Sequence, residues 1–232
     1  MIYERRELSA SQVASRIGVS HGRATELMRS GVLPGRQLPS GEWLTSAPAI
    51  EAFQLNARRG KGRALSSSSA WGVLWELSGI RPEWLERSTL SRLRAQLEGW
   101  EAVDILRAVS GRTRETRFFL ARKGTQADVI ATGIAAAAPL RLKLRIDKDV
   151  VAGYVDPGAA EHFARVHEMV PDYEGKHVLY ENTLPIPWRK GRMPNAVVAC
   201  DLARSRKIYE REQAILALTD LKEKWIRRNS MS

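Results

Sequence analysis

Residues 9–31 read SASQVASRIGVSHGRATELMRSG, and this stretch decides how the first part of the chain folds. Ser9 is a suitable N-cap for a first helix, and Gly18 supplies the left-handed residue that ends it. Ser20 then caps a second helix. The apolar residues that recur at helical spacing in and before the first helix are Leu8, Val13, Ala14 and Ile17. The sequence therefore predicts two short helices joined by a tight turn.

The second predicted helix has an inward stripe made of Ala24, Leu27 and Met28. The residues left toward solvent are His21, Gly22, Arg23, Glu26 and Arg29. In a helix-turn-helix, side chains near the start of the second helix contact base edges in the major groove. A helical hairpin without any DNA partner has a similar pattern, and this alternative stays open.

A hairpin and a third helix are expected next. Val32–Leu44 predicts two short strands around a turn at Ser40-Gly41. The third helix is expected over Ala49–Arg58, where the residues that would close a small core are Ile50, Phe53 and Leu55.

The order of these elements resembles the winged helix-turn-helix domains of excisionases and MerR-type regulators. That order is helix, turn, second helix, Gly-Val-Leu-Pro, hairpin and closing helix. The most specific part pairs ASRIGVSHGRATELMRSGVLP with the hairpin that contains Trp43. The resemblance implies that the second helix contacts DNA through Ser20, His21, Arg23 and Arg29. It also implies contacts from the hairpin, or wing, through Arg36 and Ser40.

Charge is consistent with a polyanionic partner. The chain has 37 Lys and Arg against 26 Asp and Glu, and residues 1–65 hold 10 basic and 5 acidic side chains. A basic surface steers encounters with nucleic acid but encodes no sequence preference. In the basic cluster that follows the third helix, Lys61 and Arg63 are predicted to contact the DNA backbone. A solvated, positively charged hinge is the alternative.

Composition predicts two domains and excludes several classes of protein. We expect a DNA-binding domain over residues 1–58, a basic and serine-rich linker over 59–68, and a second domain over 69–232. Cys200 is the single cysteine, which excludes an intrachain disulfide and any multi-thiolate metal site. No apolar run approaches the ~20 residues that span a bilayer, and no signal peptide is visible. We expect a cytoplasmic protein.

The second domain is predicted to mix helices with strands, so the fold class is α+β. Helices are expected over residues 69–79, 80–85, 90–111, 134–138, 157–169 and 208–227. Strands are expected over residues 116–121, 150–155, 177–181 and 196–200, and residues 140–146 are ambiguous between a strand and an extended connection. The tryptophans expected in the core or at helix junctions are Trp71, Trp75, Trp84 and Trp100.

Four segments of this domain resemble the antitoxins of AbiE abortive-infection systems. They are SSAWGVLWELSGIRPEWLERSTLSRLRAQL, DVIATGIAAA, VVAGYVDP and NAVVACDLARSRKIYEREQAILAL. The resemblance implies an antitoxin that represses its own operon and counters a nucleotidyltransferase-like toxin, without a stable complex being required. The family usually has Asp-Pro-Arg before the last helix, where this chain has Arg204-Ser205-Arg206-Lys207.

Enzymatic chemistry has little support in the sequence. There is no P-loop, dinucleotide-binding fingerprint or nucleophile elbow. Asp147 and Asp149 could form a nucleotidyltransferase-type Mg²⁺ pair, but a turn between strands is favoured. The other candidate for a catalytic site is Cys200-Asp201, at the end of an expected strand. The simpler interpretation of Cys200 is a small buried apolar side chain. We expect no enzyme, no cofactor and no metal site.

These patterns together predict a sequence-specific DNA-binding transcriptional regulator, acting as antitoxin and autorepressor of an AbiE-like operon. The alternative is a phage or mobile-element regulator, similar to an excisionase, whose second domain serves oligomerisation or partner contact. A nucleotidyltransferase-like enzyme is the least favoured. The expected partner is double-stranded DNA with operator repeats, and no membrane partner is expected. Whether the chain binds DNA as a dimer and whether it contacts the toxin directly are left open.

Overall fold

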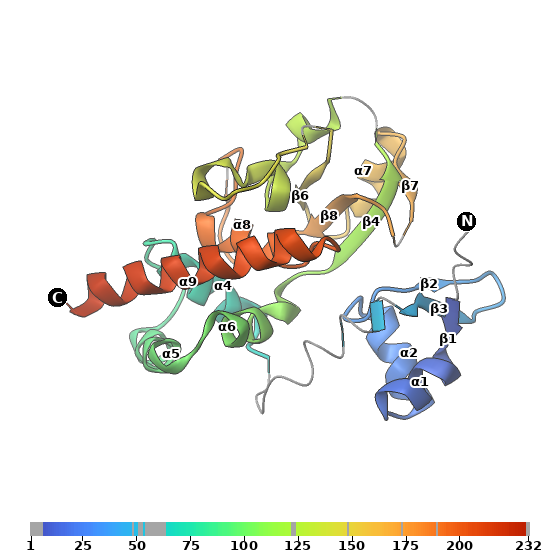
Figure 1. Cartoon of the computed structure of the whole chain (residues 1–232), viewed down its shortest axis with the longest axis horizontal. Helices are drawn as coiled ribbons and strands as arrows, with labels where there is room; N and C mark the ends of the chain where they lie inside the picture. The colour runs from blue at the N-terminus through green and yellow to red at the C-terminus, as the bar shows by residue number, and fades with distance from the viewer. Residues whose placement is uncertain are drawn as a thin grey trace. The chain divides into compact units, whose positions relative to one another are not determined.

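The computed structural model describes residues 7–47, 49, 50, 53, 64–121, 124–147, 149–172, 174–188 and 190–230. They belong to two compact units, one within Met1–Lys61 and one within Gly62–Ser232. Figure 1 shows helices and strands in both units, and the fold class is α+β as expected.

The described part of the first unit combines helices with a small antiparallel sheet. Its elements are β1 (Glu7–Ser9), α1 (Ala10–Ile17), α2 (His21–Arg29), β2 (Arg36–Gln37) and β3 (Trp43–Ser46). The strand order is β1-β3-β2. The sequence did not predict β1: Leu8, assigned above to the helical spacing, lies in this strand opposite Thr45. The helix begins only after Ser9, because Ser9 and Gln12 form a capping box there.

The local turns of this unit form as the sequence predicts. Gly18 has a φ of 72°, in the left-handed region, and ends α1. The Ser20 hydroxyl caps α2 by accepting a hydrogen bond from the Arg23 backbone N–H. The β2–β3 hairpin turns at Gly41, whose φ is 86°. The residues that form the buried core are Ala10, Val13, Ala14, Ala24, Leu27, Met28, Leu33, Ala49 and Ile50. Of the predicted third helix, Ala49, Ile50 and Phe53 are helical, and the rest lies outside the described residues.

The second unit contains a mixed five-stranded sheet. Its strands are β4 (Glu115–Leu120), β5 (Ile130–Ala131), β6 (Ala152–Val155), β7 (Val170–Pro171) and β8 (His177–Glu181). Their order is β5-β6-β8-β4-β7. The central pair β6–β8 is parallel, and the other pairs are antiparallel.

Helices cover both faces of this sheet, as Figure 1 shows. The helices of the unit are α4 (Ser67–Leu77), α5 (Arg87–Gly99), α6 (Ala102–Ala108), α7 (Ala160–Val166), α8 (Asn195–Leu202) and α9 (Ile208–Ser230). Val178 and Tyr180 of β8 belong to the larger core, which α4, α8 and α9 complete. Leu179, which points to the opposite face, packs with Ala160 and Ala164 of α7. Trp71 and Trp75 lie fully buried in the larger core, and Trp84 and Trp100 pack against it, as expected.

The predicted strand at residues 196–200 is wrong. These residues form α8, in which every residue from Ala196 to Leu202 is buried. A short apolar run has the same composition in a buried strand and in a buried helix, so hydrophobic periodicity could not separate the two.

Smaller predictions about the second unit also need correction. The serine run is the first turn of α4, which Ser66 caps, and so it does not belong to a linker. Residues 80–85 form a turn closed by the Leu85 N–H and the Pro82 carbonyl, where a helix was expected. The helical pattern over residues 90–111 corresponds to two α-helices, α5 and α6, which Trp100 and Glu101 separate, and residues 133–136 form a 3₁₀ turn. Residues 140–146 form no strand: Leu140 ends a 3₁₀ turn, Arg141 has a left-handed φ of 52°, and the rest is an irregular connection.

Candidate nucleic-acid interface

The packing of α2 fixes which of its side chains reach solvent. Ala24, Leu27 and Met28 are buried against the rest of the first unit. Because residues of an α-helix are about 100° apart around the axis, Gly22, Glu26 and Arg29 fall near the centre of the opposite face. His21 and Arg23 then lie on the two sides of Gly22, within the first turn.

His21 and Arg23 are the most available polar side chains of this face. Both are exposed, and within the described part of the chain neither side chain forms a hydrogen bond or an ion pair. The first turn that carries them is held by Ser20, whose Oγ lies 3.2 Å from the Arg23 backbone nitrogen. The cap therefore fixes the backbone while the two side chains remain free to contact a ligand.

Arg29 has a weak internal partner. Its Nη1 lies 3.4 Å from Glu26 Oε2, and the two side chains are 65% and 52% exposed. An exposed ion pair of this kind contributes at most about 1 kcal/mol, so a stronger anion such as phosphate can replace the carboxylate.

The hairpin contains Arg36, which is paired with an acidic residue, and an exposed turn at Ser40. Arg36 donates to both carboxylate oxygens of Glu7, from Nε at 3.1 Å and from Nη2 at 2.6 Å. Its charge is largely satisfied inside the unit, and a phosphate contact would have to compete with Glu7. Ser40 is exposed beside Gly41, where Gln37 Nε2 donates to the Gly41 carbonyl at 3.0 Å. Lys61 and Arg63 lie outside the described residues.

Sequence reasoning missed the support for this hairpin. Strand β1 pairs with β3 and places Glu7 beside Arg36. Thr45, fully buried, donates its hydroxyl to the Pro34 carbonyl at 2.5 Å. Gly35 approaches β3 so closely that a Cβ would lie 2.8 Å from the Leu44 carbonyl oxygen. The alternation of Glu7, Leu8 and Ser9 was the available signal, although three residues are too few to predict a strand.

The second unit has a buried polar cluster around Asp201. Asp201 accepts hydrogen bonds from Arg112, from Thr132 at 2.6 Å and from Tyr154 at 2.9 Å. Burial opposes the charge of Arg112, but the Asp201 carboxylate, together with Tyr154 and Cys200, more than offsets this and raises the pKa of Arg112. Burial also raises the pKa of the Cys200 thiol to about 12. A protonated thiol in a closed cluster is not a nucleophile, so this cluster is structural.

The other enzyme candidate of the sequence is the pair Asp147 and Asp149. Asp147 closes a turn by accepting the Asp149 backbone N–H at 3.0 Å. The described residues contain no group of three or more His, Cys, Asp or Glu side chains that could hold a metal ion.

Comparisons with known proteins give no relative. No protein-family model, no curated protein and no solved structure matches this chain. Within the described ranges, none of the helices combines the length and the apolar character that crossing a membrane requires.

Proposed function

We propose that this chain is a sequence-specific DNA-binding transcriptional regulator whose first unit is a winged helix-turn-helix. In this proposal α2 is the recognition helix and the β2–β3 hairpin is the wing. The observation that carries it is the first turn of α2, where a capped backbone presents the exposed, unpaired side chains of His21 and Arg23.

Each residue of the proposed interface has a chemical role. Arg23 can donate two hydrogen bonds to the major-groove edge of guanine, and His21 can contact a base or phosphate on the other side of Gly22. Ser20 and Ser40 can donate hydroxyl hydrogen bonds to phosphate, and Arg29 can exchange Glu26 for a phosphate oxygen. Arg36, Lys61 and Arg63 would add contacts to the DNA backbone.

The test replaces Arg23 with alanine in the full chain. We expect Arg23→Ala to weaken binding to a specific operator by about 1–3 kcal/mol, because a guanine contact is lost. Footprinting of the region upstream of its own gene would first locate the operator, and a binding titration at fixed salt would then measure the affinity.

The matched control is Arg145→Ala, which removes the same charge from an exposed position in the second unit. Arg23→Lys separates the two kinds of contact, since lysine retains the charge but not the bidentate geometry. Equal operator affinities for the wild type and Arg23→Ala would contradict the assigned role.

An antitoxin and autorepressor role is the more specific form of the proposal, and it rests on the resemblance to AbiE antitoxins. The resembling segment at residues 195–218 is helical at α8, where a strand was expected, so the geometry adds no support to this form. Coexpression with a toxin-like gene from the same locus tests it: growth should be rescued by the full chain. A regulator of a mobile element would bind its operator without any rescue.

A further inference from the structure

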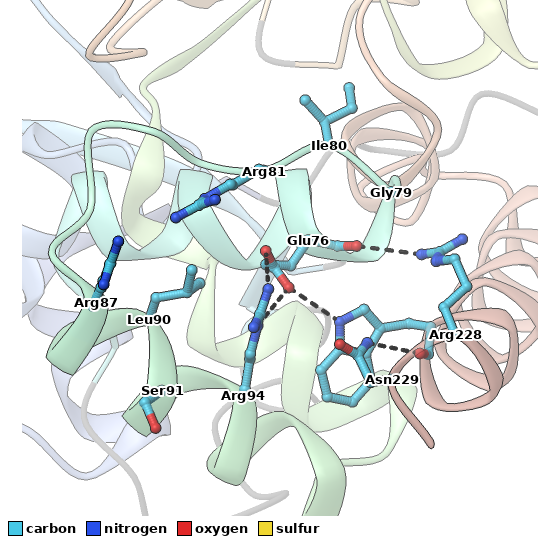
Figure 2. Close-up of a pocket in the computed structure, with 11 residues that line it drawn as sticks. Glu76, Gly79, Ile80, Arg81, Arg87, Leu90, Ser91, Arg94, Arg228 and Asn229 are labelled. Atoms are coloured by element: carbon cyan, nitrogen blue, oxygen red, sulfur yellow. Dashed lines mark hydrogen bonds and ion pairs between the residues drawn. The ribbon is translucent and has the colours of Figure 1, made fainter. Parts of the chain in front are cut away.

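A pocket of about 570 Å³ lies in the second unit, where the end of α4, the segment after it, α5 and the end of α9 meet. Its volume falls within the range of small-molecule sites, ~300–1,000 Å³. Figure 2 shows four arginines around it, namely Arg81, Arg87, Arg94 and Arg228, and Glu76 is the one acidic side chain that lines it.

Glu76 and Arg94 form the fixed centre of the pocket. Glu76 is 8% exposed, and Arg94 donates to its two oxygens from Nε at 2.9 Å and from Nη2 at 3.0 Å. The Trp225 indole N–H lies 3.4 Å from the same carboxylate. This pair immobilises the Arg94 guanidinium, and its Nη1 takes no part in the pair.

Arg81 and Arg87 lie on the side of the pocket opposite Arg228, as Figure 2 shows. Both are exposed, and neither side chain has a hydrogen bond or ion pair among the residues that the structure describes. Three arginines elsewhere in the unit have acidic partners: Arg107 with Asp104, Arg112 with Asp201, and Arg117 with Glu115. Arg81 and Arg87 are therefore two cations of the pocket that no described acidic side chain neutralises.

This arrangement favours one class of ligand. Guanidinium groups donate paired hydrogen bonds to phosphoryl oxygens, and neighbouring cations repel one another until an anion lies between them. Arg81 and Arg87 point into the pocket from one side and Arg94 lies beneath Glu76, as Figure 2 shows, so a chain of phosphoryl groups offers oxygen atoms to both positions. Ile80 and Leu90 complete the wall with apolar surface.

We propose that this pocket is a binding site for small anions that carry a chain of phosphoryl groups, either inorganic tripolyphosphate or a nucleoside triphosphate. Arg81 and Arg87 hold one end of the chain, and Arg94 Nη1 holds the other. The site lies outside the proposed DNA-binding unit, and it does not depend on the regulator being a winged helix-turn-helix.

The test is calorimetric titration of the full chain with sodium tripolyphosphate and, separately, with ATP, at constant ionic strength. The double variant Arg81→Gln/Arg87→Gln should bind both ligands about tenfold more weakly or worse, because charge-assisted hydrogen bonds are lost. The variant avoids Arg94, whose removal would leave Glu76 buried without its cation.

The matched control is Arg92→Gln/Arg145→Gln, which removes two exposed charges from the same unit, neither of which lines the pocket. It should change both affinities by less than about twofold, since surface charges act only through the long-range field. Weaker binding of ATP alone in the pocket variant would still support the site and would assign it to nucleotides.

Three results would overturn the proposal. The first is no measurable binding of either ligand by the wild type. The second is an equal loss of affinity in the pocket variant and the control variant. The third is unchanged ligand binding together with weaker binding to duplex DNA, which would make the pocket part of a nucleic-acid surface.

Discussion

At the scale of single residues, Asp201 is the side chain on which the second unit most depends. It is 3% exposed, and three donors from separate segments converge on its two oxygens. We expect Asp201→Asn to lower the free energy of unfolding by about 3–5 kcal/mol, because Arg112 would remain buried without a compensating charge. Urea denaturation measures this.

Asp220→Asn is the control for that measurement. Asp220 pairs with Lys224 on the surface of α9, with both side chains 54% exposed, and its loss should cost less than about 1 kcal/mol. Similar stabilities for the two variants would show that the Asp201 cluster does not hold the unit together.

Residue roles were predictable where they depend on near neighbours. The caps at Ser9 and Ser20 and the left-handed Gly18 follow from a few adjacent letters, and all three are confirmed. The partners of Asp201 were not predictable, because Arg112 is 89 positions away in the chain. For the same reason, no local pattern indicated that Arg81, Arg94 and Arg228 line one pocket.

At the scale of elements, α2 contains a glycine whose presence its own packing does not explain. A Cβ on Gly22 would meet no described atom within 4 Å. Glycine costs about 1 kcal/mol relative to alanine inside a helix, so Gly22→Ala should stabilise the first unit by about that amount. If α2 approaches DNA closely at Gly22, the same variant should weaken operator binding by about tenfold, or ~1.4 kcal/mol.

Two measurements on one protein make this prediction decisive. Thermal unfolding reports the gain in stability, and an operator titration reports the loss in affinity. Gly99→Ala, at the end of α5 with open space around it, is the control and should leave DNA binding unchanged. A stabilised Gly22→Ala variant with full operator affinity would place this face of α2 away from DNA.

Elements were predictable where amphipathic periodicity is strong. Helices were expected where α5 and α9 lie, and Leu90, Leu93 and Leu97 of α5 show why, since these buried residues recur at helical spacing. Periodicity is lost in α8, where all sides are buried, and it never develops in the three residues of β1. Amphipathic helices could therefore be predicted from the sequence, whereas the fully buried helix α8 could not.

At the scale of the whole molecule, stability should depend on pH through His177. Burial lowers the pKa of His177, with Lys176 adding to the effect, and His177 Nδ1 accepts the Val151 N–H at 3.0 Å. The native state thus holds this histidine neutral, while the unfolded chain takes up the proton near pH 6.5. The contribution of His177 to the free energy of unfolding is complete above about pH 6.5. It is lost as the pH falls from there toward the lower native pKa of this histidine.

Urea titrations at about pH 7.5 and about pH 5.5 measure this contribution. We expect the wild type to lose more stability between these conditions than His177→Gln, which has no titrating group at the position. Equal losses in the two proteins would assign the acid sensitivity to other groups.

The uneven placement of the tryptophans has a practical consequence for spectroscopy. Trp43 lies in the first unit, and the other six of the seven in the chain lie within Gly62–Ser232. Trp71, Trp75 and Trp225 are at most 1% exposed there. Intrinsic emission accordingly reports almost entirely on the second core, and a melting curve recorded by fluorescence can leave α1 and α2 nearly unseen. A label or an NMR resonance in α2 is the appropriate monitor for that part of the chain.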